Sequence, residues 1–87
     1  MYNLSKAISW NEVDDGAVIL VHATGDYLHF DSSTCYAIRR LVGGATLTQL
    51  VRELSNQYPD INPNQIQSDY EELINALINK RILEESR

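Results

Sequence analysis

Cysteine is nearly absent from this 87-residue sequence, in which Cys35 is the only one. A single cysteine excludes an internal disulfide framework and fits a reducing compartment. Long apolar runs are also missing, because the longest, residues 17–21, is far too short to cross a bilayer and no signal-type segment follows the N-terminus. We therefore expect a cytoplasmic protein that has no membrane partner.

Cations are scarce as well. The chain has 7 Lys and Arg residues against 12 Asp and Glu, which gives a net charge of -5. Phosphate binding requires clustered Lys and Arg, so this balance disfavours nucleic acid as a partner. The adjacent Arg39 and Arg40 are interpreted as part of a solvated helix face.

Patterns typical of catalysis or metal binding are also missing. His22, His29 and Cys35 are the only soft ligands, and their spacing matches no zinc motif. Gly43-Gly44 lacks any phosphate-binding pattern. We expect no catalytic residue, no metal and no cofactor. A competing hypothesis is a small enzyme using Cys35 and His29 as a nucleophile pair, but Cys35 lies on a predicted apolar helix stripe, which favours a buried, inert thiol.

Three strands are predicted in the first third of the chain. Residues 7–13 alternate between apolar and polar, residues 17–21 are continuously apolar, and residues 27–30 form a third short strand. The continuous segment is expected to be the central strand. In the third strand, Leu28 and Phe30 should share one face, and Tyr27 and His29 the other. Residues 1–6 are expected to be a loose lead-in.

Three helices should follow. Asp31 is a good N-cap for the first, which should end at Gly43-Gly44. Thr46 with Gln49 forms a capping box for the second, and Asn62 followed by a proline begins the third, which should run to about residues 80–81. The predicted fold class is α+β: a three-stranded antiparallel meander followed by three helices, similar to a winged helix-turn-helix. We expect one domain over residues 1–87, with its core at about 7–84.

The third strand suggests a function, because the last strand of a meander has one unpaired edge that another chain can extend. We predict that this edge and the third helix form a groove for a peptide. Leu28 and Phe30 would line its strand side, Asp69 and Glu72 its rim, and an apolar helix face the other side, made of Tyr70, Leu73, Ile74 and Leu77. Plain core packing of Leu28, Phe30, Leu73 and Leu77 is the alternative, and the residues alone leave both interpretations open.

The second and third helices also form a helix-turn-helix pattern. A winged-helix DNA-binding transcriptional regulator is therefore the alternative function. The predicted third helix opens with amide and acidic side chains, and its first cation is Lys80. Phosphate would repel that face, so we prefer the peptide hypothesis.

An ordered set of segments resembles the coenzyme PQQ synthesis protein D family, whose members recognise ribosomally made, post-translationally modified peptides. The segments cover about residues 7–84 and comprise Val18-Ile19-Leu20-Val21, Gly25-Asp26-Tyr27-Leu28-His29-Phe30-Asp31, Ile38-Arg39-Arg40-Leu41-Val42-Gly43-Gly44-Ala45-Thr46-Leu47, Leu50-Val51-Arg52-Glu53-Leu54, Tyr58, Asp69, Leu73, Leu77 and Arg81-Ile82-Leu83.

The resemblance implies a non-catalytic domain that binds the leader segment of a precursor peptide. It also implies delivery of that precursor to a leader peptidase or another modifying enzyme. Because this is a short stand-alone chain, it looks most like the recognition subunit of a split lasso-peptide leader-processing system. The implied peptide-binding residues lie on the third strand and the third helix: Tyr27, Leu28, His29, Phe30, Ile66, Asp69, Tyr70, Leu73, Ile74 and Leu77.

Overall fold

A computed structural model describes residues 1–85 of the chain. Its main sheet has three antiparallel strands in the order β2 (Ile8–Val13), β3 (Gly16–Val21) and β4 (Asp26–Asp31). Three helices follow the sheet, so the predicted α+β class is confirmed, and the continuously apolar strand is the central one. Within residues 1–85, no helix has the length and apolar character needed to span a membrane.

The pairing of β3 with β4 fixes which side chains face the helices. Ala17 lies opposite Phe30, and Ile19 lies opposite Leu28. Ala17 and Ile19 are fully buried. On β4, the alternate side chains of Tyr27 and His29 point to the opposite face of the sheet and are exposed. At the end of the pair, a Cβ atom on Gly16 would collide with the carbonyl oxygen of Phe30. Glycine therefore lets the two strands close up where the chain enters the first helix.

The helices are α1 (Ser32–Val42), α2 (Leu47–Gln57) and α3 (Pro63–Asn79), and all three predicted N-caps are present. The carboxylate of Asp31 accepts a hydrogen bond from the Thr34 amide at 2.8 Å. Thr46 and Gln49 make both bonds of the capping box. The side chain of Asn62 accepts from the Asn64 amide at 2.9 Å. These local bonds set where each helix begins.

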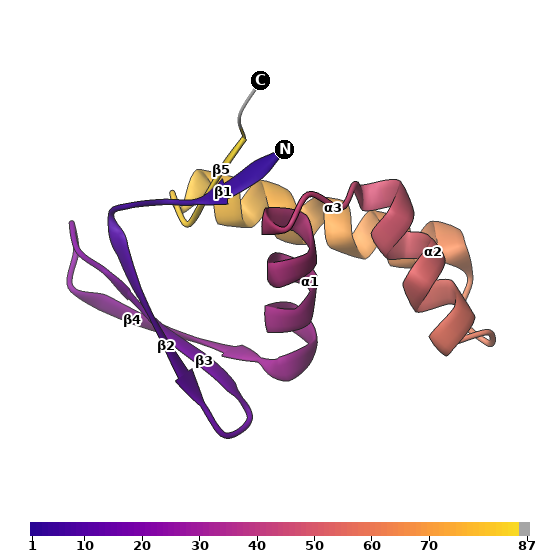
Figure 1. Cartoon of the computed structure of the whole chain (residues 1–87), viewed down its shortest axis with the longest axis horizontal. Helices are drawn as coiled ribbons and strands as arrows, with labels where there is room; N and C mark the ends of the chain where they lie inside the picture. Colours follow the sequence, from indigo (N-terminus) through magenta and orange to yellow (C-terminus); the bar gives the residue numbers. More distant parts are fainter. Residues whose placement is uncertain (86–87) are drawn as a thin grey trace.

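Helix α1 lies between the main sheet and α2, and α3 crosses behind α1 (Figure 1). Its first turns pack on the sheet, where Cys35 lies in a buried cluster with Ala17 and Ile19. Its opposite side packs on α2 and α3 through Ala37 and Leu41. A further buried cluster ties α1 to α3 and the C-terminal segment, and it contains Ile38, Leu77, Ile82 and Leu83.

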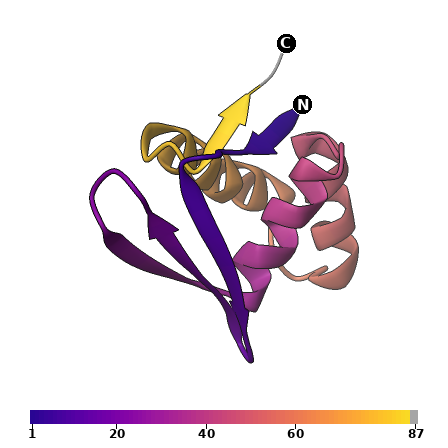
Figure 2. The same ribbon diagram turned by 60° about the vertical axis from the view of Figure 1, so that its left-hand side comes forward.

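The two ends of the chain form a second, two-stranded sheet. Strand β1 (Tyr2–Leu4) pairs antiparallel with β5 (Leu83–Glu85), and the two strands lie side by side in Figure 2. The expectation of a loose lead-in at residues 1–6 was therefore wrong. Arg81, in the left-handed region with φ of 61°, reverses the chain after α3 and directs β5 toward β1. Leu83 is buried in the pairing segment, so this small sheet closes the core.

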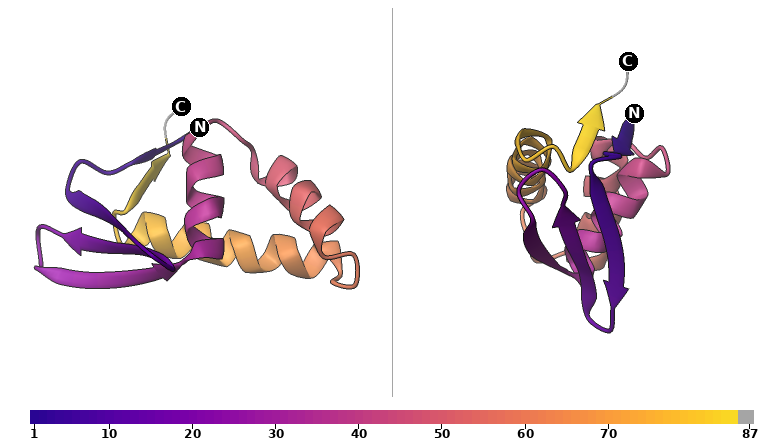
Figure 3. Two further views of the ribbon diagram at one scale, coloured as in Figure 1. Left: turned by 60° about the horizontal axis from the view of Figure 1, so that its bottom comes forward. Right: turned by 90° about the vertical axis from the view of Figure 1, so that its left-hand side faces the viewer.

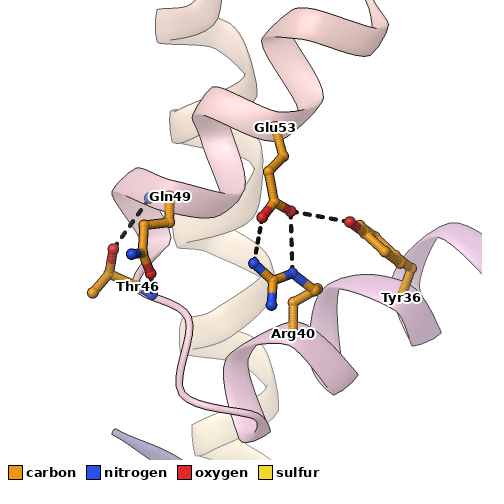
Figure 4. A network of polar contacts seen from close by, with 5 residues as sticks. All are labelled: Tyr36, Arg40, Thr46, Gln49 and Glu53. Carbon is orange, nitrogen blue, oxygen red and sulfur yellow. Dashed lines mark hydrogen bonds and ion pairs between the residues drawn. The ribbon is translucent and has the colours of Figure 1, made fainter.

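A polar network joins α1 to α2 (Figure 4). The Tyr36 hydroxyl donates to Glu53 Oε2 at 3.0 Å, and the Arg40 guanidinium contacts both oxygens of the same carboxylate. Arg40 and Tyr36, in that order of importance, lower the pKa of Glu53. Arg39 forms an ion pair with Glu12 on β2. Arg39 and Arg40 thus lie on a solvent-accessible face of α1, as interpreted from the sequence, and each also pairs with an acidic side chain of a neighbouring element.

Candidate functional site

Strand β4 lies at one side of the main sheet and pairs only with β3. Within residues 1–85 its outer edge has no strand partner. Alternate residues of an antiparallel strand direct their backbone N–H and C=O groups to each side, so part of the β4 backbone faces outward. This edge is the first half of the candidate site.

One side of α3 provides the second half. Leu73, half-buried on α3, and Leu28 and Phe30 of β4 all pack against the same buried cluster. Strand β4 and helix α3 run alongside each other in opposite directions (Figure 3). At one end Asp31 lines a cavity with Asp69, and at the other end Asp26 lines a cavity with Lys80. Between those points, five residue-to-residue steps along the strand and eleven along the helix each span about 16 Å.

Three cavities follow this surface, which we call the β4–α3 groove. A cavity of about 280 Å³ lies at the start of α1 and is lined by Asp31, Ser33, Thr34, Asp69, Tyr70 and Leu73. A neighbouring cavity of about 210 Å³ shares Ser33, Asp69 and Tyr70 with it and adds Leu54, Tyr58, Ile61 and Ile66. At the other end, a cavity of about 200 Å³ is lined by Val21, Thr24, Asp26, Leu28 and Lys80.

The groove is negative near the start of α1. Burial raises the pKa of Tyr70, and Asp31, Tyr58 and Asp69 raise it further. The Thr34 backbone amide, followed by the Thr34 side chain, lowers the pKa of Asp31. At neutral pH this end therefore presents an ionised carboxylate beside a protonated phenol, which can donate a hydrogen bond.

The predicted strand residues divide between two faces. Leu28 and Phe30 point into the groove side of the sheet and are half-buried. Tyr27 is 69% exposed on the opposite face, and His29 lies there too, with its Nε2 atom 3.4 Å from Asp15. The side chains of Tyr27 and His29 therefore face away from the groove, and contact of their backbone groups with a peptide stays a prediction.

The predicted helix residues also divide. Asp69, Tyr70 and Leu73 are accessible in the groove, and Ile66 lines its apolar end although it is only 6% exposed. Ile74 is buried on another side of α3, where it lines a cavity with Tyr2 and Leu47. Leu77 is 2% exposed and belongs to the core beneath Leu28 and Leu73. Contact of all these positions with a peptide stays a prediction.

Sequence reasoning missed several residues that line the groove. Ser33 and Thr34 follow directly from the N-cap at Asp31, so the start of α1 had to lie at the end of β4. Tyr58 and Ile61 are large apolar residues in the α2–α3 loop, 51% and 45% exposed. Their presence beside a proline in an otherwise polar loop was a signal for an apolar surface.

The alternative nucleophile pair is not assembled. The Cys35 Sγ atom faces the core and donates to the Phe30 carbonyl oxygen at 3.7 Å, whereas His29 lies on the opposite face of the sheet. Burial and then the charge of Asp31 raise the pKa of Cys35, so the inert thiol predicted from the sequence is what the structure contains. Residues 1–85 contain no group of three His, Cys, Asp or Glu side chains able to hold a metal ion.

Fold and groove together define a small winged-helix-like α+β domain whose last sheet strand is open to strand addition. The family model for coenzyme PQQ synthesis protein D (PqqD) matches residues 16–83, and the chain belongs to this family. The family suggested by the sequence segments is therefore confirmed.

Two solved structures are similar over nearly the whole chain. "TbiB1 in Complex with the TbiA(beta) Leader Peptide" is 25% identical, with a TM-score of 0.80 and 98% of each chain covered. "Lasso peptide synthetase B1 complexed with the leader peptide" is 20% identical, with a TM-score of 0.85 over 97% of this chain and 98% of the other, and this likeness shows the shared fold. No curated protein matches the chain.

Proposed function

We propose that this chain binds the leader segment of a ribosomally synthesised precursor peptide. The leader adds as a strand to the free edge of β4 and packs on the exposed side of α3. The chain itself is non-catalytic and presents the bound precursor to a leader peptidase or another peptide-modifying enzyme. The site of this action is the cytoplasm, where the precursor is translated.

One observation carries the proposal: the unpaired β4 edge lies directly beside an apolar surface of α3 with three cavities along it. The relative that is 25% identical over 98% of both chains was solved with a leader peptide. Family membership supports the same function, but the groove geometry gives a reason for it in this chain's own residues.

Strand addition explains how a small domain without a deep cavity holds a peptide. Backbone hydrogen bonds to β4 provide affinity for any extended chain, and pockets that receive alternate side chains provide specificity. A peptide paired along the whole of β4 has about six residues in the added strand. Every second side chain then faces Leu28, Phe30 and Leu73, which already pack against a common buried cluster.

The division of side chains on β4 leaves room for an enzyme. A peptide in the groove covers α3 and one edge of the sheet, whereas Tyr27 and His29 remain on the face turned away from the helices. The domain can therefore hold the leader while the part of the precursor beyond the added strand extends toward the partner enzyme.

A binding titration tests the proposal. The full chain is titrated with synthetic leader segments of precursor peptides encoded beside its gene, and a scrambled copy of each leader is the matched control. Saturable binding of a leader, at least tenfold tighter than its scrambled copy, is expected. The absence of binding by every leader to the folded chain would contradict the proposal.

A further inference from the structure

Two carboxylates that line the groove have no ion-pair partner among the described residues. Two other carboxylates are paired with arginines: Glu12 with Arg39 and Glu53 with Arg40. Asp31 and Asp69 accept hydrogen bonds from the Thr34 amide and the Gln65 side chain, but within residues 1–85 neither forms an ion pair.

These two carboxylates come from different elements and line one cavity. Asp31 ends β4 and caps α1, while Asp69 projects from the second turn of α3. The cavity between them, about 280 Å³, also presents the hydroxyl groups of Ser33 and Thr34 and the ring of Tyr70. It joins the apolar part of the groove at Leu73, so a side chain from a peptide in the groove has a direct path into it.

The cavity suits a basic side chain in three ways. Two carboxylates attract its charge, hydroxyl oxygens accept its remaining N–H groups, and the Tyr70 ring offers a cation–π contact. The hydrogen bond from the Thr34 amide lowers the pKa of Asp31, so that carboxylate stays ionised at neutral pH. Burial, followed by the charge of Asp31, raises the pKa of Tyr70. The aliphatic stem of a lysine or arginine would lie against Leu73.

The opposite end of the groove lacks this preference. Its cavity is lined by Asp26 and Lys80, one charge of each sign, together with Val21, Thr24 and Leu28. The groove is therefore electrically asymmetric, with a net negative charge only where β4 meets α1.

We propose that the cavity between Asp31 and Asp69 binds a lysine or arginine side chain of the peptide that occupies the β4–α3 groove. This inference rests on the proposed function and adds a charge requirement to it. Because the main sheet is antiparallel and parallel pairing is slightly less stable, the added strand runs opposite to β4. The basic residue then lies at the N-terminal end of the added segment.

The test removes single charges from the peptide and from the protein and measures the binding affinity of each combination. A leader peptide that binds the wild-type chain is prepared in copies in which each Lys or Arg is replaced singly by Gln. All copies are titrated against wild type, Asp69→Asn, Asp31→Asn and Glu72→Gln. Asparagine retains N-capping ability at position 31. Glu72→Gln is the matched control. The sequence predicted Glu72 on the rim of the groove, but in the structure it is exposed on α3 and lines none of the three groove cavities, so this change removes the same charge from outside the groove lining.

We expect one basic residue, at the N-terminal end of the binding segment, whose replacement weakens binding roughly fivefold, as for a solvent-accessible ion pair. Asp69→Asn and Asp31→Asn should each weaken binding of the parent peptide by a similar factor. Both variants should bind the Gln-substituted peptide with nearly the same affinity as the wild-type chain. Glu72→Gln should change the binding affinity of both peptides equally and by less than about twofold.

Three results would overturn the inference: equal affinity of all the peptide copies, losses from Asp69→Asn that do not depend on the peptide's charge, or an equal loss in Glu72→Gln. In each of these cases peptide binding itself persists, so the proposed function stands. If no leader binds the wild-type chain, the proposed function fails first.

Discussion

The two edge strands of the main sheet are similar in length but lie beside different elements. β2 and β4 each have six residues, and each pairs only with β3 in the described chain. Beside β2 lie α1 and β1, around a cavity of about 330 Å³ lined mainly by apolar side chains, and the Arg39–Glu12 ion pair connects strand and helix there. Beside β4 lies α3, with Asp26, Asp31, Asp69 and Lys80 outside any ion pair within residues 1–85.

This difference leads us to expect that an open edge alone does not make a binding site. Free backbone groups are common to both edges. Beside β4, however, α3 provides a surface about 16 Å long that follows the strand and has an apolar centre and polar ends. Beside the β2 edge, a cavity lies at the end of α1. We therefore expect specificity at β4 to come from the helix beside the strand.

The largest effect is expected where the groove rests on the core. Leu77 is 2% exposed beneath the groove, whereas Leu73 is half-buried at its surface. Leu77→Ala should lower the free energy of unfolding by about 2–5 kcal/mol, because it leaves a cavity in the core. Leu73→Ala should cost less stability and weaken peptide binding more. Urea denaturation and peptide titration of both variants measure the two quantities, and the reverse ranking would contradict the assignment of Leu77 to the core.

A pair of tyrosines distinguishes the groove from the outer face of the sheet. Tyr70 lines two groove cavities, and Tyr27 is 69% exposed on the face turned away from the helices. Tyr70→Ala should weaken peptide binding at least tenfold, as expected for a buried aromatic contact, while Tyr27→Ala should change it less than about threefold. Circular dichroism checks that both remain folded. Equal affinities of the two variants would count against the β4–α3 groove.

The smallest effect is expected at the α1–α2 network, remote from both edges. Arg40 and then Tyr36 hold the pKa of Glu53 below its ordinary value. The ionised carboxylate therefore stabilises the folded chain above the ordinary pKa of a glutamate, and this contribution is lost as the pH falls through the lowered pKa. Glu53→Gln should thus be less stable than wild type at neutral pH, with the difference shrinking under acid conditions.

Thermal denaturation at several pH values measures this difference, and a peptide titration of Glu53→Gln at neutral pH should match wild type. A gap in stability that widens in acid would contradict the ion-pair interpretation. A change in peptide affinity would show that the network influences the groove.

Much of the fold was predictable because its signals are local. The strands β2, β3 and β4 were expected within one or two residues of their observed ends, from apolar alternation and turn glycines. The three N-caps were predicted correctly, since each depends on side chains within three residues of the helix start. The open edge of β4 followed from its place as the last strand of the meander.

The unpredicted parts depend on contacts between distant segments. β1 and β5 come from opposite ends of the chain, and three residues each are too few to show a strand pattern. The sequence predicted one apolar face on the third helix, but it did not predict which element each side chain of that face contacts. Tyr70 and Leu73 lie in the groove, whereas Ile74 faces a cavity beside Tyr2 and Leu47.

The most direct test of the central claim is a backbone scan of a bound leader peptide. Copies of the peptide, each N-methylated at one backbone nitrogen, are titrated against the wild-type chain. Strand addition predicts a loss of about tenfold or more at every second position over a segment of about six residues, because only alternate N–H groups face β4. Equal affinities for all copies, or losses that recur with a helical period, would contradict addition of the peptide to the β4 edge.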